Sequence, residues 1–171
     1  MSLADTRIRH CLDACRQNNR TALVSFITAG DPGPSYTVAA LHSLVAGGVD
    51  ILELGIPFSD PEAEGPSIQA ANERALAHGV TLANVLQMVE EFRLKDATTP
   101  VVLMGYLNSV LAMEDFAERA GGAGVDGLIM VNLPPEEGDQ LQRKLAANNI
   151  DLIYLLAPTT TDERARQIAV K

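Results

Sequence analysis

Tryptophan is absent from the 171-residue sequence, aromatic residues make up 4% of it, and cysteine occurs twice. Basic residues are also scarce, because 13 Lys and Arg stand against 22 Asp and Glu, for a formal charge of −9. This balance repels nucleic-acid phosphates and anionic lipid headgroups, so we expect neither a nucleic-acid nor a membrane partner. A phosphorylated substrate stays possible, because backbone N–H groups at a helix N-terminus bind phosphate even in an acidic protein.

Long apolar runs are also missing. No run approaches the roughly 18 residues of a membrane span, and the first ten residues hold no apolar signal core, so we expect a cytoplasmic protein. Cys11 and Cys15 share one expected helix at a spacing that suits neither a mutual disulfide nor a zinc motif, which predicts reduced thiols. His10, His42 and His78 lie on expected helices away from strand ends, which predicts surface or packing roles and no metal cluster.

Apolar residues are abundant, at 47% of the chain, which is enough for a buried core. Strand-like apolar runs alternate with helical patterns along the whole sequence. Strict alternation predicts parallel strands joined by right-handed crossovers, which is the α/β class. The expected strands cover residues 21–28, 49–54, 101–104, 127–131 and 152–156. The expected helices cover residues 2–17, 35–46, 67–77, 113–120 and 136–147, with further helices starting near Thr81 and Thr161.

Residues 46–57 and 122–134 resemble each other. Each segment has glycines that we interpret as a helix stop (47–48 and 121–122), then Val-Asp, an apolar strand and a proline-started loop. Repeated βα units favour a (β/α)8 TIM barrel over an open doubly wound sheet. Residues 162–171 stop inside a helical pattern without a capping glycine. We therefore expect residues 1–171 to form a single partial barrel of about five βα units, truncated at the C-terminus.

In such a barrel, functional residues gather at the carboxyl ends of the strands. Glu53 lies inside the apolar run 49–56, from which a carboxylate is normally excluded. A carboxyl group in the barrel mouth has a raised pKa that suits general acid–base work. The alternative is a Glu53 that is paired with a nearby Arg or Lys, or that faces water.

The loop at residues 57–66 carries three carboxylates between prolines and glycines. Asp60 or Glu64 could place a second acid–base group over the pocket, and the alternative is a solvated acidic loop that caps the next helix. Four more side chains stand where a pocket wall is expected. Phe26 fits barrel core equally well, and Asn108 could bond its own loop. The four residues are Phe26, Thr28, Tyr106 and Asn108.

Residues 53–69 read ELGIPFSDPEAEGPSIQ, which closely resembles the signature L-E-L-G-[IV]-P-F-S-D-P-x-A-D-G-P-x-I-Q of the tryptophan synthase α chain family. Four further segments resemble that family in the correct order, so the resemblance spans essentially the whole chain. They are FITAGDP at 26–32, LMGYLN at 103–108, GVDGLI at 124–129 and APTTTDE at 157–163.

The resemblance implies retro-aldol cleavage of indole-3-glycerol phosphate to indole and glyceraldehyde 3-phosphate, without cofactor or metal. It implies that Glu53 is the catalytic carboxylate and that Glu64 stands where the family carries an Asp that accepts a hydrogen bond from the indole N–H. It also implies an αβ complex with a tryptophan synthase β chain. The implied substrate-binding residues are Phe26, Asp60, Met104, Tyr106, Asn108, Ile129 and Leu155.

Two residues depart from the family pattern. Glu64 is one methylene longer than the family's Asp, and a displacement of roughly an ångström can cost on the order of a hundredfold in rate. Asn132 replaces an Asp before Leu133. The family's phosphate site and mobile sixth loop lie beyond these residues. We therefore expect the 171-residue piece to be inactive alone and to associate or misfold through uncovered strand edges.

Two other functions compete with this interpretation. One is another phosphate-binding barrel, such as a histidine-pathway isomerase, and the contiguous signature around Glu53 argues against it. The other is a non-catalytic barrel paralogue, or an interaction subunit that binds a β-type partner through its strand-end loops. Indole production by a complete chain separates the enzyme from the interaction protein.

Overall fold

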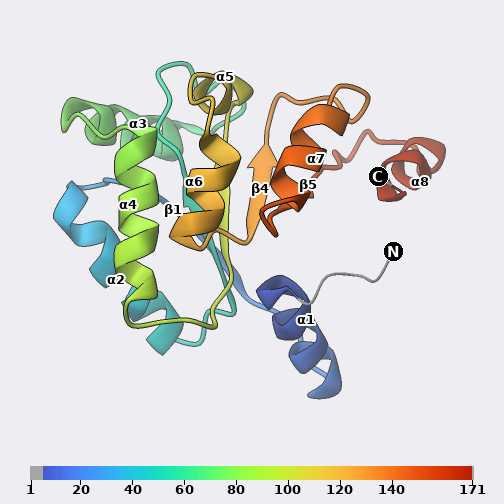
Figure 1. Cartoon of the computed structure of the whole chain (residues 1–171), viewed down its shortest axis with the longest axis horizontal. Coiled ribbons are helices and arrows are strands. Elements are labelled where there is room, and N and C mark those ends of the chain that lie inside the picture. Colours follow the sequence, from blue (N-terminus) through green and yellow to red (C-terminus); the bar gives the residue numbers. More distant parts are fainter. Residues whose placement is uncertain (1–5, 171) are drawn as a thin grey trace.

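A five-stranded parallel sheet forms the centre of the computed structural model, which describes residues 6–170 (Figure 1). The strands are β1 (Val24–Thr28), β2 (Ile51–Gly55), β3 (Val101–Gly105), β4 (Gly127–Met130) and β5 (Asp151–Ile153). Each strand pairs with the next one along the chain, in the order β1-β2-β3-β4-β5. A doubly wound sheet reverses its strand order at a switch point, so this order agrees with the predicted barrel and excludes the open alternative.

Helices connect and cover the strands. Three of them begin at a threonine whose hydroxyl accepts a backbone N–H of the first turn: Thr6, Thr81 and Thr161. Within residues 6–170, no helix is long and apolar enough to cross a membrane. The helices are α1 (Arg7–Gln17), α2 (Pro34–Ala46), α3 (Pro66–Ala77), α4 (Leu82–Arg93), α5 (Leu107–Leu111), α6 (Phe116–Ala123), α7 (Asp139–Ala146) and α8 (Asp162–Ala169).

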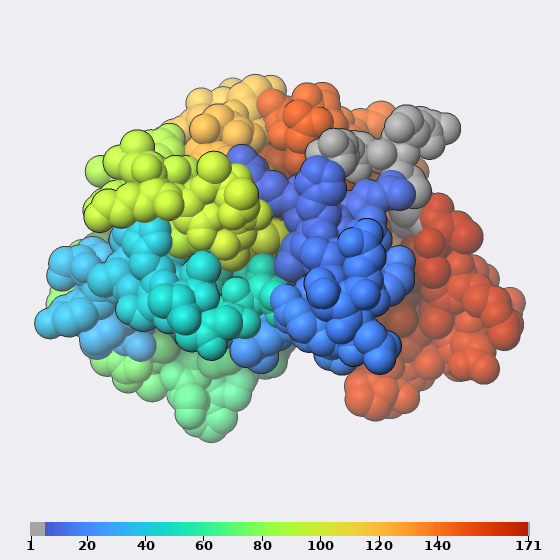
Figure 2. Space-filling view, turned by 90° about the horizontal axis from the view of Figure 1, so that it is seen from below, coloured from blue at the N-terminus to red at the C-terminus, as the bar shows by residue number. Residues whose placement is uncertain are grey.

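The two faces of the sheet pack differently. Leu52 and Leu54 point outward into the main core beneath the helices. The alternate residues point to the concave face, where Ile51, Val102 and Ile129 form a smaller cluster. α1 covers this cluster from the amino ends of the strands, with Ile8 and Cys11 packed against it. Figure 2 shows this end of the molecule, where α1 (blue) lies between α2 (cyan) and the C-terminal residues (red).

A buried ion cluster also ties α1 to the sheet. Asp126, just before β4, accepts hydrogen bonds from Arg7 Nη1 at 2.8 Å and from Arg93 Nη2 at 2.6 Å. It also accepts the backbone N–H of Val101 at 2.8 Å. The side chain of Asp126 is only 5% exposed, so its charge is balanced by these partners rather than by water. The cluster therefore joins α1, α4, β3 and β4 at one point.

Several expected element ends were wrong, and one short helix was not predicted. β1 begins at Val24 rather than at residue 21. β5 ends at Ile153 rather than at residue 156, and the next residues leave the sheet because β5 has a partner on one side only. The predicted stop at Gly121 and Gly122 lies inside α6, and the helix ends at Gly124, which takes the left-handed conformation at φ +87°. The short helix α5 was not predicted, because five residues are too few to show a helical period.

Candidate active site

The carboxyl ends of β1, β2 and β3 bring the candidate residues together on the concave face. Glu53 lies on β2 and pairs with Phe26 of β1. Two residues further along β2, Gly55 pairs with Met104 of β3. Gly55 is required here because a Cβ atom at this position would lie 2.6 Å from Phe26 Cζ. The glycine therefore lets the Phe26 ring lie across the end of β2.

The strand ends enclose a cavity of about 10 Å³. A space of this size holds about one water molecule, so access for any larger ligand requires the lining loop or side chains to move. The cavity is lined by Phe26, Thr28, Gly55, Ile56, Glu64, Ile68, Asn72, Met104, Gly105 and Tyr106.

The loop that carries Glu64 is fixed at two points. Asn72, buried on α3, accepts the backbone N–H of Phe58 at 2.9 Å and donates to Ile68 O at 2.8 Å. Tyr106 accepts the backbone N–H of Ala63 at 3.0 Å, and its ring stacks on Phe58 with centroids 4.8 Å apart. The loop therefore has a defined position over the strand ends.

Two carboxyl groups interact near the cavity: Glu64 lines it, and Glu53 lies on β2 beside Phe26. Burial raises the pKa of Glu53 above its ordinary value, and the charge of Glu64 raises it further. Burial also raises the pKa of Glu64. Both groups hold a proton at a higher pH than a free glutamate does, which suits groups that donate and accept protons.

We expect this raised pKa to make stability depend on pH. Between the ordinary pKa of 4.5 and the higher folded value, the folded chain keeps a proton on Glu53 that the unfolded chain releases. Stability therefore falls as pH rises through this window. Glu53→Gln removes the effect, so its stability relative to the natural chain, measured by urea unfolding, should increase as pH rises above 4.5. Glu62→Gln, at an exposed position of the loop that follows β2, is the control. A stability difference that does not change with pH would contradict the assignment.

The structure brings some of the predicted site residues together. Phe26, Glu64, Met104 and Tyr106 line the cavity, together with Thr28. Glu53 is half-buried beside Phe26. Ile129 pairs with Met104 on the concave face, but it packs into the cluster that α1 covers.

Three predicted substrate-binding residues lie away from the cavity. Leu155 follows the end of β5 and is 52% exposed, because the strand ends three residues earlier than predicted. Asp60 is exposed on the outer side of the loop, where it accepts the Ser59 hydroxyl at 2.7 Å. Asn108 is exposed because α5 turns it away from the strand end.

Sequence reasoning missed two polar residues. The sequence could have indicated Asn72, because it is a polar residue on the apolar face of α3 that also contains Ile68 and Ala75. Asn132 was noted only as a departure from the family pattern. Its Oδ1 accepts the Leu107 N–H at 2.8 Å, so it joins the end of β4 to the start of α5.

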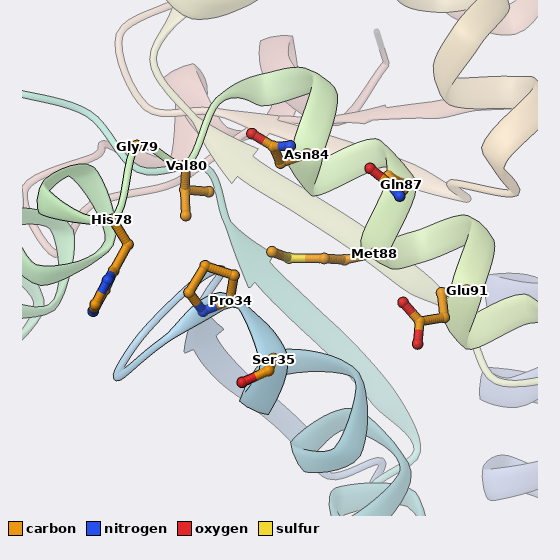
Figure 3. Close-up of a pocket in the computed structure, with 9 residues that line it drawn as sticks. All are labelled: Pro34, Ser35, His78, Gly79, Val80, Asn84, Gln87, Met88 and Glu91. Atoms are coloured by element: carbon orange, nitrogen blue, oxygen red, sulfur yellow. The ribbon is translucent and has the colours of Figure 1, made fainter.

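A larger pocket lies elsewhere, on the helical surface. It measures about 370 Å³ and opens between the start of α2, the α3–α4 turn and α4 (Figure 3). His78 borders it and hydrogen-bonds Pro32 O at 3.0 Å, so this histidine contacts the loop after β1 and the prediction that it lies far from strand ends was wrong. The pocket contains none of the strand-end carboxylates. We therefore place the candidate chemistry in the smaller cavity.

Known proteins resemble this chain closely. A relative from Marinobacter nauticus, a tryptophan synthase alpha chain, is 55% identical over 166 residues, which are 96% of this chain and 62% of the relative. A crystal structure of the Legionella pneumophila tryptophan synthase alpha chain gives a TM-score of 0.91 at 50% identity, over 96% of this chain and 63% of that one. A crystal structure of the Pyrococcus furiosus tryptophan synthase complex gives a TM-score of 0.81 at 38% identity, over 86% of this chain and 61% of that one.

The chain thus spans about three-fifths of the length of these relatives. The solved structures confirm the predicted barrel fold for the part that they cover. The sequence model of the family described as "Tryptophan synthase alpha chain" matches residues 12–171, which is most of the sequence. This chain belongs to the tryptophan synthase alpha chain family.

Proposed function

We propose that this chain is part of a carbon–carbon lyase that cleaves indole-3-glycerol phosphate to indole and glyceraldehyde 3-phosphate, in tryptophan biosynthesis in the cytoplasm. The observation that carries the proposal is the pair of carboxyl groups with raised pKa, Glu53 and Glu64, at the carboxyl ends of the strands. Family membership supports the same reaction.

Glu53 moves the protons in this reaction. Its carboxyl group protonates C3 of the indole ring, which places a positive charge on the ring nitrogen. Removal of the proton from the glycerol hydroxyl then lets the C–C bond break. The electron pair of the broken C–C bond returns to the indole and restores its aromatic ring. The carbon that carried the hydroxyl becomes the aldehyde carbon. A half-buried group with a raised pKa can serve in both directions near neutral pH.

Glu64 stabilises the charge that appears on the indole nitrogen. Its carboxylate faces the same cavity and accepts the N–H hydrogen bond, which strengthens as positive charge develops there. Phe26 and Met104 supply apolar walls for the flat ring. The phosphate group is bound by βα units beyond those in this chain.

We expect Glu64→Asp to release indole at an equal or higher rate, by up to about a hundredfold, because the shorter side chain restores the carboxylate position of the family signature. The measurement is indole release from indole-3-glycerol phosphate under saturating substrate, by this chain joined to the remaining C-terminal part of the Marinobacter nauticus relative. Glu62→Asp, at an exposed position of the same loop, should change nothing. A clear loss of rate in Glu64→Asp would show that the longer side chain is the one fitted to this site.

The chain's partner is a tryptophan synthase β chain. The solved complex of the relative from Pyrococcus furiosus supports this assembly. We propose that the 171-residue chain alone is inactive, because its relatives are longer by about two-fifths of their length.

The deciding experiment joins this chain to the remaining C-terminal part of the Marinobacter nauticus relative and measures indole release. Activity that the 171-residue chain alone does not show supports the lyase. A folded hybrid that binds a β chain but releases no indole, at any pH tested, would favour the interaction subunit.

A further inference from the structure

A second cluster of reactive side chains lies at the opposite end of the strands from the candidate active site. Cys11 and Cys15 occupy successive turns of α1 and face Asp50, which precedes β2. The two sulfur atoms and a carboxylate oxygen of Asp50 all lie within 4.8 Å of one another. The sequence showed only the two cysteines, since Asp50 reaches them through the fold.

The separations suit one ion. Each Zn–S bond is about 2.3 Å long, so two sulfur atoms at the tetrahedral angle on a common ion lie about 3.8 Å apart. Rotation of the two cysteine side chains about their Cα–Cβ bonds brings the sulfur atoms closer together than the 4.8 Å limit within which they lie here. Thiolates with one carboxylate form a ligand set that soft and borderline cations prefer, and a water molecule completes a tetrahedron.

Asp50 is already held in place for such a role. It accepts two hydrogen bonds from Arg20, at 2.6 and 2.7 Å, and the Leu23 N–H at 2.8 Å. Carboxylates that bind metals are commonly fixed by hydrogen bonds of this kind. The positive charge of Arg20 balances the negative charge of the Asp50 carboxylate. The two positive charges of a divalent ion therefore balance the two thiolates.

We propose that Cys11, Cys15 and Asp50 form a binding site for a thiophilic divalent cation of the zinc and cadmium class. The ion displaces one proton from each thiol and joins α1 to the start of β2. Cys15 is buried and Cys11 is partly exposed, so the ion reaches the site from the Cys11 side. The site is structural, because it lies at the amino end of the strands.

Binding is expected to depend on pH. Burial raises the pKa of Cys11 to about 11, with further contributions from Cys15 and Asp50, while Arg20 acts in the opposite direction. A thiol must lose its proton to bind a metal ion, so the ion competes with protons and its affinity increases with pH.

The test titrates Cd²⁺ into the reduced 171-residue chain and follows the ultraviolet thiolate-to-cadmium absorption. We expect one ion per chain, two protons released per ion, competition by Zn²⁺ but not by Mg²⁺, and a thermal midpoint that rises with bound Zn²⁺. Absence of binding, or an absorption band unaffected by the removal of Cys11, overturns the proposal.

Substitutions at the three proposed ligands test whether each one binds the ion. Cys11→Ser and Cys15→Ser should each lose more affinity than the roughly tenfold to hundredfold that an outer-shell partner contributes. Asp50→Asn should also bind more weakly, and binding as tight as in the natural chain would remove Asp50 from the site. Asp13→Asn makes the same charge change on an exposed face of α1 and should bind normally. Circular dichroism confirms folding, and Cys11→Ser decides the case if the variant at buried Cys15 unfolds.

Discussion

Glu53→Gln should lower the rate of indole release by about a hundredfold to ten-thousandfold, which is the usual contribution of a positioned general acid–base group. Glutamine keeps the shape of the side chain but cannot transfer a proton. The rate is measured on the chain joined to the C-terminal part of a relative.

Substrate binding should change much less than turnover, because the walls formed by Phe26 and Met104 are untouched. A fall in kcat with a nearly constant KM therefore separates a catalytic role from a structural one. Glu62→Gln, in the neighbouring loop, controls for loss of one negative charge. A Glu53→Gln enzyme within tenfold of the natural rate would remove Glu53 from the mechanism.

Asp126→Asn should lower the free energy of unfolding by about 3–5 kcal/mol, the usual effect of removing one partner of a buried ion pair. Arg93, whose side chain is 11% exposed, would keep its charge but lose its ion pair with Asp126. Desolvation already lowers the pKa of Arg93, and the charge of Asp126 opposes that shift. The new amide N–H₂ would also face donors from Arg7, Arg93 or Val101.

Urea unfolding of the 171-residue chain measures this change. Asp13→Asn provides the matched control, because its ion pairs with Arg9 and Arg16 are exposed and should contribute less than about 1 kcal/mol. Comparable losses in the two variants would show that the Asp126 cluster is no stronger than a surface ion pair.

Sequence patterns predicted the elements better than their ends. The strand starts follow from apolar runs between glycine and proline signals, because a buried parallel strand must be apolar on both faces. The run at 152–156 looked like the others, but pairing on one side only holds the strand to Ile153. The prediction at Gly121 was wrong because a glycine ends a helix only where its backbone takes the left-handed conformation. In α6 this residue is Gly124.

The candidate site was predictable only where a single residue contradicted its surroundings. Glu53 stood out because a carboxylate inside an apolar run needs an explanation. Asn72 binds a residue 14 positions away in the sequence, and Asp50 binds one 30 positions away. Local sequence patterns do not predict contacts over such separations. Asp60 and Glu64 share one acidic loop, yet only Glu64 turns toward the cavity.

The order of the strands also bears on how the polypeptide matures during synthesis. Within the described residues, every strand after β1 pairs with the strand made just before it. Each of these βα units can dock as it leaves the ribosome, and the loop-closure entropy of each step is that of a single crossover. The sheet of residues 6–170 can therefore grow one strand at a time in the order of synthesis.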